Sequence, residues 1–205
     1  MQAEKWMKWA VELQSLAQAG MYYSRDSYDI QRFERVREIA AEMVSEGSDM
    51  PMEKVKELFC CEVGYQTPKV GCRGAVFKDD KILLVQENNG RWALPGGWVD
   101  VYCSIKEGVE KEVWEEAGLK VTAQKLIALL DWKKYCDPPR AYGICTAFFL
   151  CRAIEGEFVE NIETLGSGYF ALDELPTLDT GKTTREHIEM CFEAYRAENW
   201  AAIFD

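Results

Sequence analysis

The spacing of apolar residues changes abruptly near residues 66–69, and this change constrains the fold more than any other feature of the chain. Before it, apolar residues recur every three or four positions, which is the period of an amphipathic helix. After it, short apolar runs are separated by turn residues, which is typical of strands. The sequence therefore predicts a small helical domain, residues 1–66, followed by a larger domain, residues 67–205.

Three helices are expected in the first domain. The apolar positions of the first helix are Trp6, Trp9, Ala10, Leu13 and Leu16. Gly20 is predicted to end this helix, because glycine tolerates the left-handed conformation that closes helices. A second helix is predicted from about Ile30 to Gly47, and a third with Asp49 as its cap and Pro51 in its first turn. Exposed Trp6 and Trp9 favour a role for this domain in dimerisation or as a lid.

The second domain reads as alternating strands and helices. The predicted strands cover 70–77, 81–87, 91–98, 119–133, 142–154 and 168–172. One helix is predicted from Ser104 to Ala117, ended by Gly118, and another from about residue 183 to 199, capped by Thr183 or Thr184. This order predicts an α/β (α+β) fold, in which helices flank a mixed sheet.

Charge and cysteine content exclude several classes of function. The net charge of −11 argues against general binding of nucleic acid or of an anionic membrane. A metal cation is then expected to mediate any contact with an anionic small molecule. The eight cysteines form no CxxC pair, and the single His187 cannot complete a zinc site, so free thiols are expected. The N-terminus resembles neither a signal peptide nor a membrane span, and a cytoplasmic location is predicted.

The stretch from Leu94 to Leu119, LPGGWVDVYCSIKEGVEKEVWEEAGL, carries the chemistry. On a helix with about 100° per residue, Glu112, Glu115 and Glu116 share an arc of about 100°. Their carboxylates would repel one another unless a cation lies between them, and oxygen ligands suit Mg²⁺ or Mn²⁺. The backbone of Gly96 and Gly97 can approach a phosphate closely. The pattern predicts a metal platform beside a phosphate cradle.

This stretch resembles the Nudix box, G-x5-E-x7-R-E-U-x-E-E-x-G-U, in which U is a bulky aliphatic residue. The matching residues are Gly97, Glu112, Val113, Glu115, Glu116, Gly118 and Leu119. The resemblance covers roughly residues 69–198 and implies the Nudix α/β/α sandwich. The helical domain resembles the N-terminal extension of a subgroup that hydrolyses nucleoside diphosphate derivatives such as CDP-choline.

The chain departs from the box at two positions. Cys103 stands where the family has its first glutamate, and Lys111 stands where the family has arginine. Glu107 is the nearest carboxylate to replace the lost one, at the edge of the acidic face. Lys111 keeps the positive charge but lacks the rigid fork of arginine. Weakened rather than abolished metal binding is expected.

The resemblance also implies the remaining parts of the site. A further metal ligand or general base is expected from Glu163, which precedes the last predicted strand, although it also reads as a surface acid. The expected metal ligands are Glu112, Glu115, Glu116 and Glu163, and the expected base is Glu115 or Glu163. The expected reaction is attack of water on one phosphorus of a diphosphate, assisted by Mg²⁺ or Mn²⁺.

Six residues are candidates for substrate contacts: Arg73, Gly96, Gly97, Trp98, Arg140 and Tyr142. Arg73 is equally compatible with a phosphate contact and a structural ion pair. Trp98 can stack on a base or pack within the protein, and Arg140 and Tyr142 lie in a loop stiffened by prolines. His187 lies among apolar helix positions and reads as a packed or surface histidine rather than a base.

Three functions remain open at this stage. The first is a hydrolase of a nucleoside diphosphate derivative, with CDP-choline as the first candidate substrate and ADP-ribose as the second. The second is a nucleotide sensor with weakened catalysis, suggested by Cys103. The third, less favoured, is a hydrolase of oxidised nucleoside triphosphates, in which the helical domain has no obvious role. A homodimer is expected.

Overall fold

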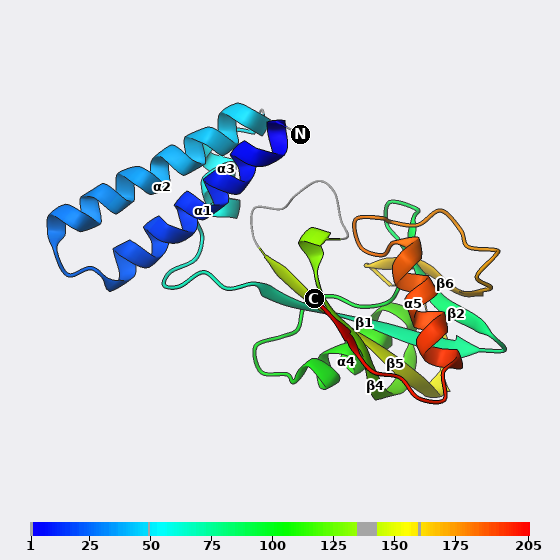
Figure 1. Ribbon diagram of the computed structural model, residues 1–205. Helices are drawn as coiled ribbons and strands as arrows, with labels where there is room; N and C mark the ends of the chain where they lie inside the picture. Colours follow the sequence, from blue (N-terminus) through cyan, green and yellow to red (C-terminus); the bar gives the residue numbers. More distant parts are fainter. Residues whose placement is uncertain (1, 49, 135–142, 160) are drawn as a thin grey trace. The chain divides into compact units, whose positions relative to one another are not determined.

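The computed structural model describes residues 2–48, 50–134, 143–159 and 161–205 (Figure 1). These residues divide into two compact units. One comprises the residues before Lys69 together with Gly143, and the other comprises the remaining residues from Lys69 to the C-terminus. Among the described helices, none is long and apolar enough to cross a membrane.

The N-terminal unit consists of α1 (Gln2–Tyr23), α2 (Ser27–Ser48) and α3 (Met52–Phe59). The turn between α1 and α2 is fixed by Asp26, whose carboxylate accepts the backbone N–H groups of Tyr28 and Asp29 at 2.9 and 3.0 Å. The buried core of the unit is formed by Ala10, Ala40, Ala41, Val44, Val55 and Phe59. Three alanines in this core let the helices pack closely.

Two glycines in these helices serve as packing points. The prediction that Gly20 ends the first helix is wrong, because α1 continues to Tyr23. A Cβ atom at Gly20 would lie 2.5 Å from the ring of Phe33, so glycine is needed for the contact between α1 and α2. In the same way, a Cβ atom at Gly47 would lie 2.3 Å from the ring of Trp6.

Trp6 accordingly packs against the core of the helical unit, and the expectation that it is exposed is wrong. Trp9 is 51% exposed, as expected. Pro51 is the residue before α3 rather than part of its first turn, and it makes no side-chain cap. Asp49, the expected cap, lies outside the described residues.

The C-terminal unit is built on a mixed sheet. Its strands are β1 (Lys69–Lys78), β2 (Lys81–Glu87), β3 (Trp92–Ala93), β4 (Leu119–Asp131), β5 (Ile144–Gly156), β6 (Thr164–Phe170) and β7 (Ile203–Phe204). Their order is β3-β2-β1-β5-β4-β7, with β6 paired to β2. β1 is antiparallel to β2 but parallel to β5. The tight turn between β1 and β2 places Asp79 and Asp80 at φ 52° and 56°, a left-handed conformation that aspartate tolerates.

A helix covers each face of this sheet. On one face, α4 (Ile105–Ala117) packs Val109, Val113 and Ala117 against strand residues such as Val76 and Leu83. On the other face, α5 (Arg185–Arg196) contributes its own apolar residues to a second core, which also contains Ile82 and Leu84. The alternation of β2 residues between the two cores follows from the period of two in a strand. The structure confirms the predicted α/β/α sandwich preceded by three helices.

Side-chain caps define where both helices start. Ser104 caps α4 and exchanges hydrogen bonds with Glu107, while Gly118 ends this helix with φ 67°. Thr184, rather than Thr183, caps α5. The hydroxyl of Thr183 instead accepts the backbone N–H of Leu94 at 3.0 Å, which fastens the segment before α5 to the glycine loop.

Candidate active site

A glycine loop runs from Leu94 to Trp98 alongside β1. The backbone N–H of Cys72 donates to Gly97 O at 2.9 Å, and that of Gly74 donates to Pro95 O at 2.8 Å. Gly96 has φ 146°, and a Cβ atom there would lie 2.1 Å from the carbonyl oxygen of Cys72. Only glycine fits this position, because both the conformation and the space exclude a side chain.

Arg73 holds this loop from the neighbouring strand. Its Nη1 donates to the carbonyl oxygen of Leu94 at 3.1 Å and also to that of Gly96. Of the two roles that the sequence left open for Arg73, the described contacts therefore support a structural one, although its partners are backbone carbonyls and not a carboxylate.

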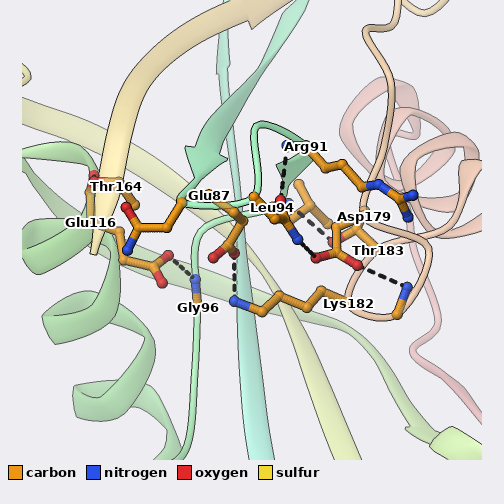
Figure 2. Close-up of polar contacts among 12 residues, drawn as sticks. Glu87, Arg91, Leu94, Gly96, Glu116, Thr164, Asp179, Lys182 and Thr183 are labelled. Carbon is orange, nitrogen blue, oxygen red and sulfur yellow. Dashed lines mark hydrogen bonds and ion pairs between the residues drawn. The ribbon is translucent and has the colours of Figure 1, made fainter. Parts of the chain in front are cut away.

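Glu116 joins α4 to the same loop. Its Oε2 accepts the backbone N–H of Gly96 at 2.8 Å, as Figure 2 shows. The residue is only 6% exposed. Burial raises the pKa of the Glu116 carboxyl to about 7, while the nearby positive charge of Arg73 opposes this shift. The Glu116 carboxyl is thus buried and held against the backbone of the glycine loop.

Glu112 lies one turn earlier on α4 and faces Gly97. A Cβ atom at Gly97 would lie 2.5 Å from Glu112 Oε2, so this glycine leaves room for the carboxylate. Burial raises the pKa of Glu112, and the negative charges of Glu115 and Glu163 raise it further. These electrostatic effects show that the structure brings the predicted acidic residues into one neighbourhood.

Lys111 lies on the exposed side of this group of glutamates and pairs with two carboxylates. Its Nζ lies 2.9 Å from Glu115 Oε2 and 3.2 Å from Asp100 Oδ2. Both partners raise the pKa of Lys111, the Glu115 contact most strongly. Lys111 thus steadies Glu115 from the box position where the family has arginine, and it ties the loop before α4 to the helix.

Glu163 is placed by Asn161, a residue that the sequence analysis missed. The Asn161 side-chain oxygen accepts the backbone N–H groups of Glu163 and Thr164 at 2.9 and 3.0 Å. Its Nδ2 donates to Glu115 O at 3.2 Å, and the Thr164 hydroxyl donates to Glu116 O at 2.8 Å. This turn therefore docks on the last residues of α4. The only sequence signal for it is an asparagine that begins a short loop.

Glu107 does not replace the carboxylate that is lost at Cys103. Its Oε2 accepts both the backbone N–H and the hydroxyl of Ser104 at 2.8 Å, so it completes the cap of α4. These hydrogen bonds lower the pKa of Glu107. Cys103 is partly exposed, and its backbone N–H donates to Asp100 O at 2.9 Å.

The donor chemistry of the site fits a divalent cation. Within the described ranges, no three acidic, histidine or cysteine side chains already converge on one point as a closed ligand set. Glu112 and Glu116 are nevertheless desolvated carboxylates, and Glu115 and Glu163 are exposed beside them. A hard cation would relieve their repulsion, and these four residues are the ones that could hold it. Glu115 would then exchange part of its contact with Lys111 for the cation.

The remaining candidates are placed as follows. Trp98 is 46% exposed next to Gly97. Arg140 and Tyr142 lie outside the described residues. His187 is buried, and burial lowers its pKa to about 4. Its Nδ1 accepts the backbone N–H of Thr184 at 3.2 Å, so this histidine belongs to the cap of α5.

The raised pKa of Glu116 leads to a prediction for the metal-free protein. Its folded-state pKa of about 7 lies above the ordinary value of 4.5, so the folded state binds this proton more tightly than the unfolded state. This contribution to stability is present at pH 4 and is lost as the pH rises through about 7. We expect Glu116→Gln to match the parent near pH 4 and to exceed its free energy of unfolding by up to about 3 kcal/mol at pH 8. Urea unfolding in EDTA at both pH values measures this difference, and an equal effect at both would contradict it.

Comparison with known proteins agrees with this geometry. Residues 67–190 match the NUDIX domain, and residues 4–59 match the UDP-X-like, N-terminal oligomerisation domain. The Bacillus subtilis strain 168 protein YjhB, provisionally named an ADP-ribose pyrophosphatase, is 37% identical over 98% of this chain and 97% of its own length.

Two solved structures are similar as well. An ADP-ribose pyrophosphatase from Streptococcus suis 89-1591 is 53% identical, covers 68% of this chain and all of its own, and has a TM-score of 0.64. A UDP-X diphosphatase is 29% identical over 99% of this chain and all of its own, with the same TM-score of 0.64. The chain that carries this glycine loop and acidic helix belongs to the Nudix family and is a Nudix pyrophosphohydrolase.

Proposed function

We propose that the protein hydrolyses the diphosphate linkage of ADP-ribose or a closely related nucleoside diphosphate derivative, with Mg²⁺ or Mn²⁺ as cofactor. The observation that carries this proposal is the hydrogen bond from Gly96 to Glu116, which joins the backbone of the glycine loop to a buried carboxylate on the acidic helix. The names of the relatives favour ADP-ribose as the first candidate substrate. CDP-choline, the first candidate from the sequence, becomes the second.

The divalent cation, when bound, would supply positive charge to the phosphate oxygens and lower the barrier to attack by water. Glu112, Glu115, Glu116 and Glu163 are the residues proposed to hold it. Gly96 is buried and bound to Glu116, whereas Gly97 is partly exposed, and the backbone of Gly97 is proposed to face the diphosphate. Lys111 keeps the Glu115 carboxylate in place from one turn away.

Glu163 is the favoured base for the attacking water. Glu115, the alternative, is engaged by Lys111 at 2.9 Å, and this contact leaves its carboxylate less free to reach the attacking water. Glu163 is exposed and is held only through its backbone by Asn161. The water adds its oxygen to one phosphorus, the bond from that phosphorus to the bridging oxygen breaks, and two phosphate monoesters leave. For ADP-ribose these are AMP and ribose 5-phosphate.

A substrate panel tests this function. The pure protein is incubated with Mg²⁺ or Mn²⁺ and with ADP-ribose, CDP-choline, NADH, nucleotide sugars or nucleoside triphosphates, and the products are separated by chromatography. Cleavage of ADP-ribose above the others supports the proposal. Cleavage of triphosphates alone would contradict it and favour the hydrolysis of oxidised nucleoside triphosphates.

A catalytically weakened nucleotide sensor is the second candidate. The observation behind it is that Glu107 is engaged in the helix cap and leaves the position of Cys103 without a carboxylate. A sensor would raise its melting temperature with a nucleotide that it does not cleave. Measurable turnover of any substrate in the panel excludes this alternative.

Restoring the missing carboxylate gives a further prediction. Cys103→Glu is expected to raise kcat/KM by about tenfold and to lower the Mg²⁺ concentration needed for half-maximal activity, because supporting residues around a metal contribute factors of this size. Cys103→Ser, which adds no charge, is the matched control. Equal activity of Cys103→Glu and the parent would show that the loop carboxylate has no role in this chain.

The helical domain, residues 1–66, is proposed to form a homodimer, and residues 67–205 to carry the hydrolase. Support comes from the description of the matching family model as an oligomerisation domain and from the exposed Trp9. Light scattering at several concentrations tests this. A strictly monomeric protein would contradict it.

A further inference from the structure

A partly buried ion pair, Glu87–Lys182, lies beside the acidic residues of α4 and was not expected from the sequence. Glu87 is the last residue of β2 and is 9% exposed. Lys182 Nζ lies 2.6 Å from Glu87 Oε1, and the two side chains are 38% and 12% exposed, respectively (Figure 2). Burial of charges at such a place is costly unless they are paired. The position of this pair therefore needs an explanation.

Glu87 is close to one of the proposed metal ligands. Figure 2 shows the carboxylates of Glu87 and Glu116 pointing toward the same space, near the backbone nitrogen of Gly96. The negative charge of Glu87 is strong enough there to raise the pKa of Glu116. The backbone links them as well, because Glu87 is paired with Thr164, whose hydroxyl donates to Glu116 O at 2.8 Å. Two buried carboxylates thus share one side of the site.

Lys182 reaches this place from a segment that is held at several points. Its backbone N–H donates to Asp179 O at 2.8 Å, and the N–H of Asp179 donates to Trp92 O at 2.8 Å. The next residue, Thr183, accepts the N–H of Leu94 at 3.0 Å. The turn from Asp179 to Thr183 is therefore fastened to β3 and to the glycine loop. The backbone of Lys182 is therefore held in place, with its ammonium group 2.6 Å from Glu87 Oε1.

We propose that Lys182 acts as a built-in cation, which neutralises Glu87 and keeps that carboxylate out of the ligand set of the divalent metal ion. This inference rests on the proposed function, in which the metal ion binds to the carboxylates of α4. Lys182 is then a positioning residue, since it acts through Glu87 and touches no reacting atom.

If Lys182 is removed, the Glu87 carboxylate is expected to become a metal ligand. Without the ammonium group, two carboxylates would face each other near Gly96, an arrangement that attracts a hard divalent cation. A metal ion drawn to Glu87 and Glu116 would leave Glu112, Glu115 and Glu163. The protein would then bind the ion more tightly and in the wrong place for the reaction. A purely structural ion pair would have no such effect on metal binding.

The test compares Mn²⁺ binding, measured by the loss of the free Mn²⁺ signal in electron paramagnetic resonance, with turnover. We expect Lys182→Met to bind Mn²⁺ about tenfold more tightly than the parent, or to bind one additional ion, while kcat falls at least tenfold. The double variant Lys182→Met/Glu87→Gln is expected to return to the Mn²⁺ affinity of the parent, because the uncompensated carboxylate is gone.

The matched control is Lys120→Met. This change also removes one lysine ammonium group, whose Nζ lies 3.3 Å from Glu155 Oε1. The side chains of Lys120 and Glu155 are 62% and 68% exposed, however, so this pair lies at the surface. We expect Lys120→Met to leave both measurements unchanged. If Lys182→Met is unfolded without metal, Mn²⁺ is expected to restore its fold, whereas the double variant folds without metal.

Two failures are distinguishable. If the parent protein binds no Mn²⁺ and cleaves no substrate in the panel, the proposed function is wrong. If the parent does both and Lys182→Met binds Mn²⁺ with the affinity and stoichiometry of the parent, or stays unfolded with Mn²⁺, the built-in cation is rejected and the pair is structural.

Discussion

Replacing Glu116 with glutamine is expected to lower kcat/KM by about 1,000-fold while the fold is retained. Glutamine keeps an oxygen that can accept the N–H of Gly96, the contact that measures 2.8 Å in the parent. It removes the negative charge that is proposed to hold the metal ion. A metal ligand contributes several kcal/mol to charge stabilisation, and about 4 kcal/mol corresponds to this factor. Steady-state kinetics with ADP-ribose and Mg²⁺ measures the loss.

Glu110 provides the matched control on the same helix. Its Oε1 also accepts a backbone N–H, that of Ala123, at 2.9 Å. It lies about 160° around the helix from Glu112, away from the acidic face. Glu110→Gln is therefore expected to keep kcat/KM within about twofold, since it leaves the site intact. A similar loss for both variants would mean that α4 tolerates no such change and that the metal role of Glu116 is unsupported.

Replacing Gly96 with alanine is expected to destabilise the protein by about 3 kcal/mol or more and to abolish activity. The added Cβ atom would lie 2.1 Å from the carbonyl oxygen of Cys72, which belongs to a central strand. At φ 146° the alanine backbone would also be strained. The loop must leave β1, and with it the N–H group that binds Glu116. Thermal and urea unfolding together with activity measure these effects.

Gly90→Ala separates backbone strain from the steric conflict. Gly90 also has a positive φ, of 79°, but a Cβ atom there meets nothing within 4 Å. We expect Gly90→Ala to cost only about 1 kcal/mol and to leave activity unchanged. If the two alanine variants lose equal stability, the close approach of the glycine loop to β1 is not what makes Gly96 necessary.

The acidic helix was predictable because its signals are local. Ser104, the glutamate three residues later and Gly118 form a cap and a stop within one short stretch, and the structure confirms both ends. The same holds for the turn between β1 and β2, where two aspartates join two apolar runs. Local hydrogen bonds decide such features, so the sequence reveals them.

The errors arose where packing between distant segments overrides local preference. Gly20 reads as a helix end, yet it lies within the last turn of α1 and allows close contact with Phe33 of α2. β7 was not predicted, because Ile203 and Phe204 form a strand only by pairing with Ala128 and Leu129. A glycine that ends a helix and a glycine at a packing point look alike in a sequence, and so do an apolar pair in a loop and one in a strand. The spacing of apolar residues therefore cannot distinguish these cases.

The supporting residues of the site were missed for the same reason. Glu87 and Lys182 are 95 positions apart (182 − 87), and each reads alone as an ordinary surface charge. Asn161 docks the turn that carries Glu163 on α4 because Glu115 O lies 3.2 Å from its side chain, a contact between segments 46 residues apart (161 − 115). Motif spacing identifies the residues on α4, whereas the residues that hold them are identified only by the fold.

The parallel pairing of β1 with β5 has a consequence for how the protein is made. Lys69 pairs with Ile144, so this ladder joins segments 75 residues apart (144 − 69), and closing so long a loop is entropically costly. Refolding dominated by such distant pairs is slow. On the ribosome, β1 emerges long before its partner, and its buried apolar face must wait for β5 to be synthesised. We therefore expect the helical unit to fold first and the catalytic unit to be the part that depends on chaperones during synthesis.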